Sequence, residues 1–195
     1  MTDAEFAELL EAGRERPNIE YKGPGSWTEL PFRARIVRAI LAMCNTRDGG
    51  QIVVGVEQQQ ETYVPIGLTP TQLATFQEET MQDGTAEYAA PYVLFTREIR
   101  QHNGAQFVAI AVQEFDQVPV ICKKDYQAIL QRGAIYVRSR TRRPESVSVS
   151  TESDMRDLIE LAVDKGIRRM RERGYVLEGQ PLIPELYDRE IEDLT

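Results

Sequence analysis

The sequence predicts an α+β fold in which short strands alternate with helices. Residues 51–56 form a nearly continuous apolar run, which is typical of a strand in the middle of a sheet. Residues 31–45 instead repeat apolar positions at helical spacing. Asn103-Gly104 separates two strand-like segments, and this dipeptide favours the tight turn that joins antiparallel strands. We therefore expect helices together with a sheet that contains at least one hairpin.

The first half of the chain alternates predicted helices and strands. Gly13 and Asp48-Gly49-Gly50 end two of the helices, because glycine readily adopts the left-handed conformation that follows a helix. Thr69-Pro70 favours the start of a third, with threonine as the N-cap and proline at the first position. The predicted helices are 4–12, 31–45 and 70–81, and the predicted strands are 18–22, 51–56 and 63–68.

The second half contains four predicted strands and a long final helix. The strands are 93–99, 106–112, 119–121 and 134–138, and the helix is 152–173, with Ser150 or Thr151 as its cap. The segment after Gly174 is strongly acidic and has two prolines, so it is either disordered or binds a partner. We divide the chain into a domain at 1–149, a C-terminal helix at 150–173 and an acidic tail at 174–195.

The composition is that of an ordinary globular protein. The 195 residues are 42% hydrophobic and 28% charged, and no apolar run is long enough to cross a bilayer. The N-terminus is acidic and lacks the basic and apolar regions of a signal peptide, so we expect a cytoplasmic protein. Cys44 lies on an apolar helical face and Cys122 follows two apolar residues, so both are expected to be buried thiols.

The charge is unevenly distributed along the chain. The net charge of −8 by itself disfavours a nucleic-acid partner, yet residues 123–143 contain seven basic residues and one acidic residue. The basic residues are Lys123, Lys124, Arg132, Arg138, Arg140, Arg142 and Arg143. Such segregation is typical of a nucleic-acid-binding face on an acidic protein. A solvated basic edge or a protein interface has the same pattern, so these interpretations stay open.

Several kinds of catalytic site are excluded by the motifs. The sequence has no phosphate-binding loop of the GxxxxGK type, no cysteine–histidine cluster with zinc-ligand spacing, and a single histidine, His102, beside the predicted turn. Three carboxylates remain, Glu15, Glu20 and Glu57, at the ends of two predicted strands. If those strands are neighbours, the carboxylates can converge on a divalent cation. Alternatively, Glu20 pairs with Lys22, and the other two acids are solvated or cap a turn.

Several motifs resemble those of the Schlafen AlbA_2 domain. Glu20-Tyr21-Lys22 is similar to its Glu-Phe-Lys motif, and residues 45–50 are similar to its Asn-Thr-x-Gly-Gly turn. Residues 52–57 resemble its next strand, which ends in Gly-Val and an acid, although Glu57 stands where aspartate is frequent. The chain also has an extra residue before the glycines and an arginine run in place of a later glycine. The resemblance covers about 15–149 and implies a mixed, mainly antiparallel sheet flanked by helices.

The resemblance also implies a function. The family is described as nucleic-acid-binding, and some vertebrate Schlafens are metal-dependent endoribonucleases that cut tRNA and rRNA. Their catalytic acids fall on Glu15, Glu20 and Glu57, which would bind Mg²⁺ or Mn²⁺, and Lys22 would steady the phosphate. The nucleic acid, RNA favoured over DNA, would be bound by Lys123, Lys124, Arg138, Arg140, Arg142 and Arg143.

The resemblance bears on partners as well. Nuclease Schlafens join two related lobes, so a single-lobe chain would form an equivalent groove as a homodimer. Standalone domains of this kind are associated with a bacterial, phage-defence setting. Two alternatives stay open: a non-catalytic nucleic-acid-binding or regulatory module, and a subunit that binds a protein partner through the final helix and acidic tail.

Overall fold

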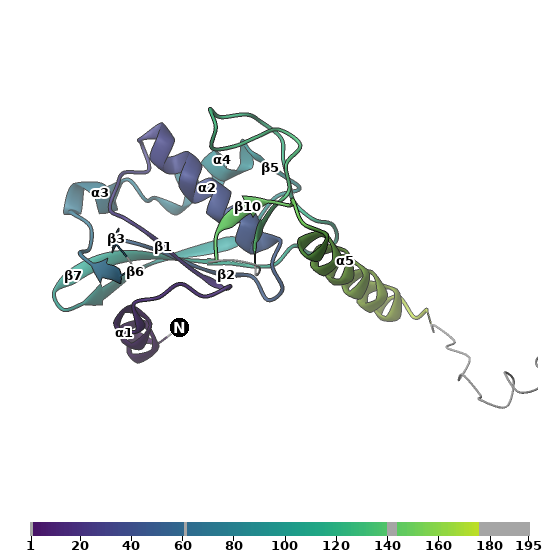
Figure 1. Ribbon diagram of the computed structural model, residues 1–195, viewed down its shortest axis with the longest axis horizontal. Helices are drawn as coiled ribbons and strands as arrows, with labels where there is room; N and C mark the ends of the chain where they lie inside the picture. The colour runs from purple at the N-terminus through teal and green to yellow at the C-terminus, as the bar shows by residue number, and fades with distance from the viewer. Residues whose placement is uncertain (1, 61, 140–143, 176–195) are drawn as a thin grey trace, which may run out of the picture.

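A four-stranded sheet lies at the centre of the fold (Figure 1). The structure is a computed structural model that describes residues 2–60, 62–139 and 144–175. Its helices are α1 (Asp3–Ala12), α2 (Leu30–Cys44), α3 (Pro70–Ala74), α4 (Glu78–Ala86) and α5 (Glu152–Glu172). Its strands are β1 (Ile19–Lys22), β2 (Gly50–Val54), β3 (Val56–Gln59), β4 (Thr62–Pro65), β5 (Ala89–Ala90), β6 (Phe95–His102), β7 (Ala105–Val112), β8 (Ile121–Cys122), β9 (Tyr136–Arg138) and β10 (Ser146–Ser148).

The central sheet has the strand order β1-β2-β7-β6. β1 and β2 are parallel and are connected through α2, whereas β7 is antiparallel to both β2 and β6. The β6–β7 hairpin turns at Asn103 and Gly104, whose φ angles of 48° and 78° are left-handed, as the dipeptide predicts. The predicted α+β fold with a mixed, mainly antiparallel sheet and a C-terminal helix is confirmed.

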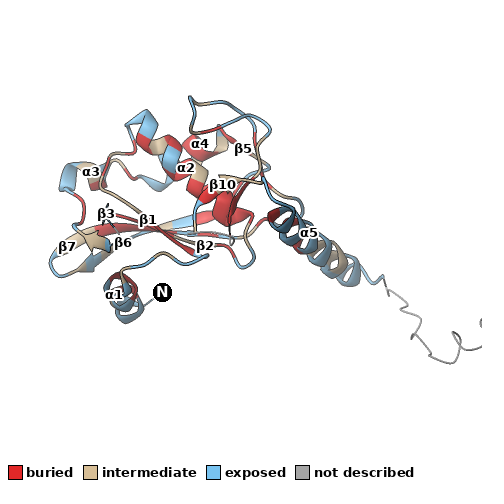
Figure 2. Ribbon diagram, in the orientation of Figure 1, coloured by how far each residue is buried: buried red, intermediate tan, exposed pale blue. Residues whose placement is uncertain are grey.

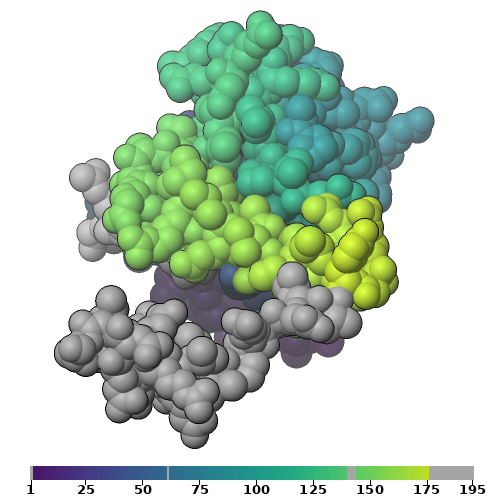
Figure 3. All heavy atoms as spheres, turned by 90° about the vertical axis from the view of Figure 1, so that its right-hand side faces the viewer, coloured from purple at the N-terminus to yellow at the C-terminus, as the bar shows by residue number. Residues whose placement is uncertain are grey.

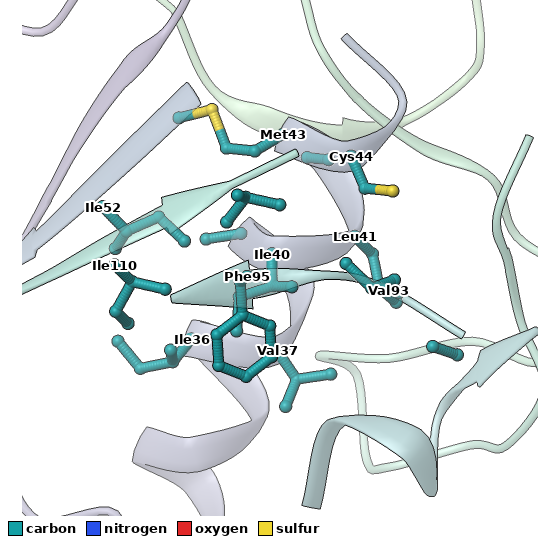
Figure 4. Close-up of a cluster of buried hydrophobic side chains, with 14 of the residues drawn as sticks. Ile36, Val37, Ile40, Leu41, Met43, Cys44, Ile52, Val93, Phe95 and Ile110 are labelled. Carbon is teal, nitrogen blue, oxygen red and sulfur yellow. The ribbon is translucent and has the colours of Figure 1, made fainter. Parts of the chain in front are cut away.

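Helices cover both faces of this sheet (Figures 1 and 2). α2 is buried along most of its length, because apolar residues recur on more than one side of it. Figure 4 shows its side chains against the sheet in a cluster that includes Ile36, Ile40, Ile52, Phe95 and Ile110. α1 packs on the opposite face through a smaller cluster that includes Phe6, Leu10, Tyr21, Val53 and Phe107. The two apolar clusters fix the sheet, and with it β1 and the polar side chains that β1 carries.

Two predicted elements are divided in the structure. The strand expected at 51–56 ends at Val54, because Gly55 has a φ of 108° and turns the chain into the β3–β4 hairpin. The helix expected at 70–81 is two helices, α3 and α4. Between them, the Thr75 hydroxyl donates to the Gln72 carbonyl at 2.6 Å and accepts from the Trp27 N–H at 3.0 Å. Both predictions of one continuous element are therefore wrong.

α5 docks on the domain at one end and extends away from it (Figures 1 and 3). Leu158 and Leu161 are buried, whereas Met155, Ile159 and Val163 are among its exposed apolar side chains. None of the described helices is long and apolar enough to span a membrane. Cys44 and Cys122 are free and buried, as expected. Most of the predicted acidic tail, 176–195, lies outside the described residues.

Candidate functional site

A pocket of about 420 Å³ lies where β1, β3 and β10 approach one another. It contains four of the residues expected at a functional site, Glu15, Glu20, Lys22 and Arg138. Further polar residues that the sequence did not indicate also line it, among them Arg38 of α2, Gln58 of β3, Glu145, and Ser146 of β10. The position of Arg38 off the apolar stripe of its helix is a weak indication in the sequence that this side chain faces a polar site. The sequence around Ser146 gives no such indication.

Arg138 of β9 is the central residue of this pocket. Its side chain is 0% exposed, and its Nη1 lies 2.9 Å from Oε2 of Glu20. Nη2 donates to Oε2 of Glu15 at 3.3 Å and to the Ile19 carbonyl at 3.1 Å. It also donates to the Arg16 carbonyl at 3.3 Å, so one guanidinium fixes both carboxylates and the backbone between them. Arg138 therefore positions the residues that lead into β1, from Glu15 to Glu20.

Glu20 is almost completely buried and has a partner on each oxygen. Lys22, two residues along β1, forms an ion pair with Oε1, and the Ser146 hydroxyl donates to Oε2 at 2.5 Å. Burial alone would raise the pKa of Glu20, but the charges of Lys22 and Arg138 and the hydrogen bonds hold it below its ordinary value. Glu20 is consequently a carboxylate in the fold.

Glu15 lies beside Glu20 in a different electrostatic environment. Its Oε1 accepts the Tyr21 N–H at 2.9 Å, and Arg138 contacts its other oxygen. Burial nevertheless raises the pKa of Glu15 above its ordinary value, against the opposing effects of that hydrogen bond and of Arg138. Two neighbouring carboxyl groups thus have pKa values shifted in opposite directions, an arrangement that recurs at sites of acid–base chemistry.

Glu57 does not join these carboxylates. The break at Gly55 places it on β3, where it is exposed and accepts a hydrogen bond from Gln59 at 3.3 Å. Its neighbour Gln58 lines the pocket in its place. The predicted convergence required β2 to continue in a straight line through residue 57, and the positive φ of Gly55 prevents that.

The residues present do not fit the predicted divalent cation. In the part of the chain that the structure describes, no group of three Asp, Glu, His or Cys side chains is placed to hold a metal ion. The Arg138 guanidinium lies between Glu15 and Glu20, where a shared cation would have to be, and Lys22 takes a further Glu20 oxygen. Mg²⁺ or Mn²⁺ would have to displace buried, hydrogen-bonded positive charges. Glu57 lies apart from Glu15 and Glu20, and the metal set expected at these three residues stays a prediction.

The basic residues expected to contact nucleic acid are not all in one place. Arg138 is buried, so the expectation that it contacts a phosphate backbone is corrected. Lys123 and Lys124 are exposed after β8, and the Lys124 ammonium lies 3.2 Å from Glu87 and 5.3 Å from the Tyr88 ring centroid. Arg140, Arg142 and Arg143 lie outside the described residues.

Replacing Glu20 with glutamine is expected to remove a pH-dependent contribution to stability. Because the pKa of folded Glu20 is below its ordinary value of 4.5, the charged group stabilises the fold fully above pH 4.5. This contribution disappears as the pH falls through the lower folded-state pKa. Urea unfolding at a series of pH values should show the gap between wild type and Glu20→Gln closing in acid. A gap of equal size at neutral and acid pH would contradict this, and Glu172→Gln, at an exposed site, is the control.

Comparisons with known proteins identify relatives of this chain. The Schlafen AlbA_2 family model matches residues 15–145. A search of curated proteins found no match. Among solved structures, the DIP2311 protein from Corynebacterium diphtheriae matches with a TM-score of 0.50 and 14% identity, over 79% of this chain and 28% of that one, and it supports the fold. The N-terminal domain of a RecG-related protein from Nitrosomonas europaea matches with a TM-score of 0.46 and 18% identity, over 73% of this chain and 94% of that one. The chain thus spans under a third of the first of these proteins.

Proposed function

The chain belongs to the Schlafen AlbA_2 family, and from this premise we propose that it binds nucleic acid, RNA in preference to DNA, without a metal ion. The observation that carries the proposal is that the basic segment stands, in the sequence, between two residues that line the pocket. Arg138 and Pro144, the residues on either side of 139–143, both line the pocket. Arg140, Arg142 and Arg143 stand between them in the sequence and supply three positive charges.

In this proposal Arg138 and Lys22 have different roles in the pocket. Arg138 is buried inside the protein and fixes the first residues of β1. Lys22, which is partly exposed and adjoins Glu20, has an ammonium group that can turn toward a phosphate at the mouth of the pocket. A phosphate contact with Lys or Arg releases condensed counterions, so the affinity should fall steeply with salt. Because the overall charge of −8 repels nucleic acid, binding depends on the positive charges of the local basic segment.

Neutralising this segment is expected to weaken binding and to flatten its salt dependence. In Arg140→Ala/Arg142→Ala/Arg143→Ala, loss of three phosphate contacts should reduce the slope of log K against log salt by about 2–3. Fluorescence anisotropy with labelled tRNA measures that slope. The matched control removes three arginines from the last turns of α5 and its C-cap, Arg168→Ala/Arg171→Ala/Arg173→Ala, and should keep the wild-type slope. Equal slopes in the wild type and both variants would show that the basic segment does not contact the nucleic acid.

RNA cleavage is a second candidate function, favoured by the opposite pKa shifts of Glu15 and Glu20 in one pocket. The test incubates labelled tRNA with wild type, Glu20→Gln and Glu57→Gln, in Mn²⁺ and in EDTA. Cutting that needs Mn²⁺ and stops in both variants would support the three-carboxylate nuclease and require a rearranged pocket. Cutting in EDTA that stops in Glu20→Gln alone would support metal-independent chemistry at this pocket. Binding without cutting under every condition would leave the binding function.

A further inference from the structure

From Arg97 onward, the outer edge of β6 presents backbone groups that have no hydrogen-bond partner in the described part of the chain. β6 is the last strand of the central sheet and pairs with β7. At the start of this ladder the Gln113 N–H donates to the Leu94 carbonyl at 3.0 Å, so alternate residues from Leu94 onward face β7. Arg97, Ile99 and Gln101 therefore direct their N–H and C=O groups away from it. No hydrogen bond to these outward groups is found within the described residues.

This edge is unusually open for a long strand. Edge strands are typically protected by being short, by a proline or a bulge, by a covering element or by charged side chains. The charges of β6 are of both signs, with Arg97 and Arg100 beside Glu98, so a second copy can match them. β6 has eight residues and pairs with β7 in continuous register, without proline. One outward carbonyl, that of Phe95, accepts a hydrogen bond from Gln82 at 2.9 Å. Ile99, in the middle of the strand, is 45% exposed. Exposing this apolar side chain to water is unfavourable, and a partner that covered it would remove part of that free-energy cost.

We propose that β6 pairs with β6 of a second copy of this chain, antiparallel about a two-fold axis at Ile99. In this register Ile99 lies beside the partner's Ile99, and Arg97 lies beside the partner's Gln101. Each of these pairs exchanges two hydrogen bonds, because the groups involved are the outward ones. Glu98 then lies opposite the partner's Arg100, and the symmetry repeats this charge pair on the other side of the axis.

The charges of the strand select this register over the alternatives. Five two-fold registers bring the outward groups of Arg97, Ile99 and Gln101 together, with the axis at any residue from 97 to 101. The registers centred on Arg97, Glu98 and Arg100 each place that residue against its own copy, which is a like-charge contact. The register centred on Gln101 places Arg100 against the partner's His102 and gains no charge pair. Arg100 already pairs with Glu98 and, at 2.8 Å, with Asp3, and a guanidinium with five N–H donors can donate to the partner's carboxylate as well.

The result is a sheet that runs continuously through two copies. β6 and β1 are at opposite ends of the strand order, so pairing at β6 leaves both pockets at the far ends of the joint sheet. Such a dimer would present two copies of the pocket. The pairing itself stands on the geometry of β6 and does not depend on the proposed function. A single strand pair buries less surface than a standard stable interface, so the dimer should be weak and is best detected by covalent capture.

Two cysteine variants test both the pairing and its register. In Ile99→Cys the introduced cysteines face each other across the axis, with Cα atoms about 5.5 Å apart, which suits a disulfide. In Gln101→Cys they stand four residues apart along the strands, about 14 Å, and cannot be joined. Both variants keep the buried Cys44 and Cys122. Under mild oxidation, non-reducing electrophoresis should show a dimer band for Ile99→Cys and none for Gln101→Cys.

A charge variant supplies a second readout in the Ile99→Cys background. Adding Glu98→Arg places like charges opposite each other on both sides of the axis and should reduce the dimer yield about fivefold. Adding Glu172→Arg, the same charge change at an exposed site on α5, should leave the yield unchanged. Cross-linking of both cysteine variants to the same extent, of neither, or with no response to Glu98→Arg would overturn the proposal.

Discussion

Replacing Arg138 with methionine is expected to lower the free energy of unfolding by about 3–5 kcal/mol. Methionine keeps most of the apolar volume but removes the positive charge that lies between Glu15 and Glu20. Glu20 is 3% exposed, so its carboxylate would keep its desolvation cost while losing an ion pair. The carbonyls of Arg16 and Ile19 would each lose one of their two hydrogen bonds as well. Urea unfolding at neutral pH measures the change.

A double-mutant cycle separates the charge from the packing. Glu20→Gln/Arg138→Met removes a carboxylate together with the guanidinium, so it should be less destabilised than the sum of the single variants. Arg138→Lys keeps the charge but cannot contact two carboxylates and the backbone together, and should fall between wild type and Arg138→Met. A loss below about 1 kcal/mol in Arg138→Met, in the range of an exposed ion pair, would contradict the central role of this residue.

Replacing Asn45 with alanine is expected to destabilise the fold by about 3 kcal/mol. The buried Asn45 amide donates at 2.9 Å to the carbonyls of both Val120 and Tyr136, and its oxygen accepts the Val120 N–H at 2.7 Å. It therefore holds the end of α2 against two segments that are distant in sequence. Alanine would leave buried backbone groups without partners, and each such group costs about 1–3 kcal/mol.

The neighbouring residue offers a control for this prediction. The Thr46 hydroxyl donates to the Ala42 carbonyl at 2.9 Å, which is a local contact at the C-terminal end of α2. Thr46→Val should therefore cost less than about 1 kcal/mol in the same urea experiment. Asn45→Asp should be destabilising too, because it removes both donors and buries a charge. Equal, small effects of Asn45→Ala and Thr46→Val would show that the three hydrogen bonds matter little.

Local pattern was sufficient to predict most of the elements. The α2 stripe, the Asn103-Gly104 turn and the Gly13 helix end each depend on residues within a few positions of one another. The break at Gly55 depends on a distant contact, since a Cβ there would lie 3.1 Å from the Gly67 backbone. No local signal distinguishes that glycine from one inside an uninterrupted strand. This break decided the position of Glu57.

The candidate site was predicted in part for the same reason. Glu15, Glu20 and Lys22 belong to one short segment, so their proximity follows from the strand between them. Arg138 is 123 residues from Glu15 and belongs to a basic run, where a solvated phosphate contact was the natural expectation. Its burial between two carboxylates is a property of the packing of β9 and β10 beside β1. The sequence does not indicate which oppositely charged residues, far apart along the chain, will form an ion pair in the fold.

The most direct test of the account is an anisotropy titration of labelled tRNA with the wild-type chain in EDTA, repeated over a range of salt. The account predicts binding at about 50 mM salt that weakens steeply and log-linearly as salt increases, with no requirement for metal. Binding that appears on adding Mn²⁺ and is absent in EDTA would contradict an Arg138-filled pocket. Absence of binding in both conditions would contradict the nucleic-acid-binding function itself.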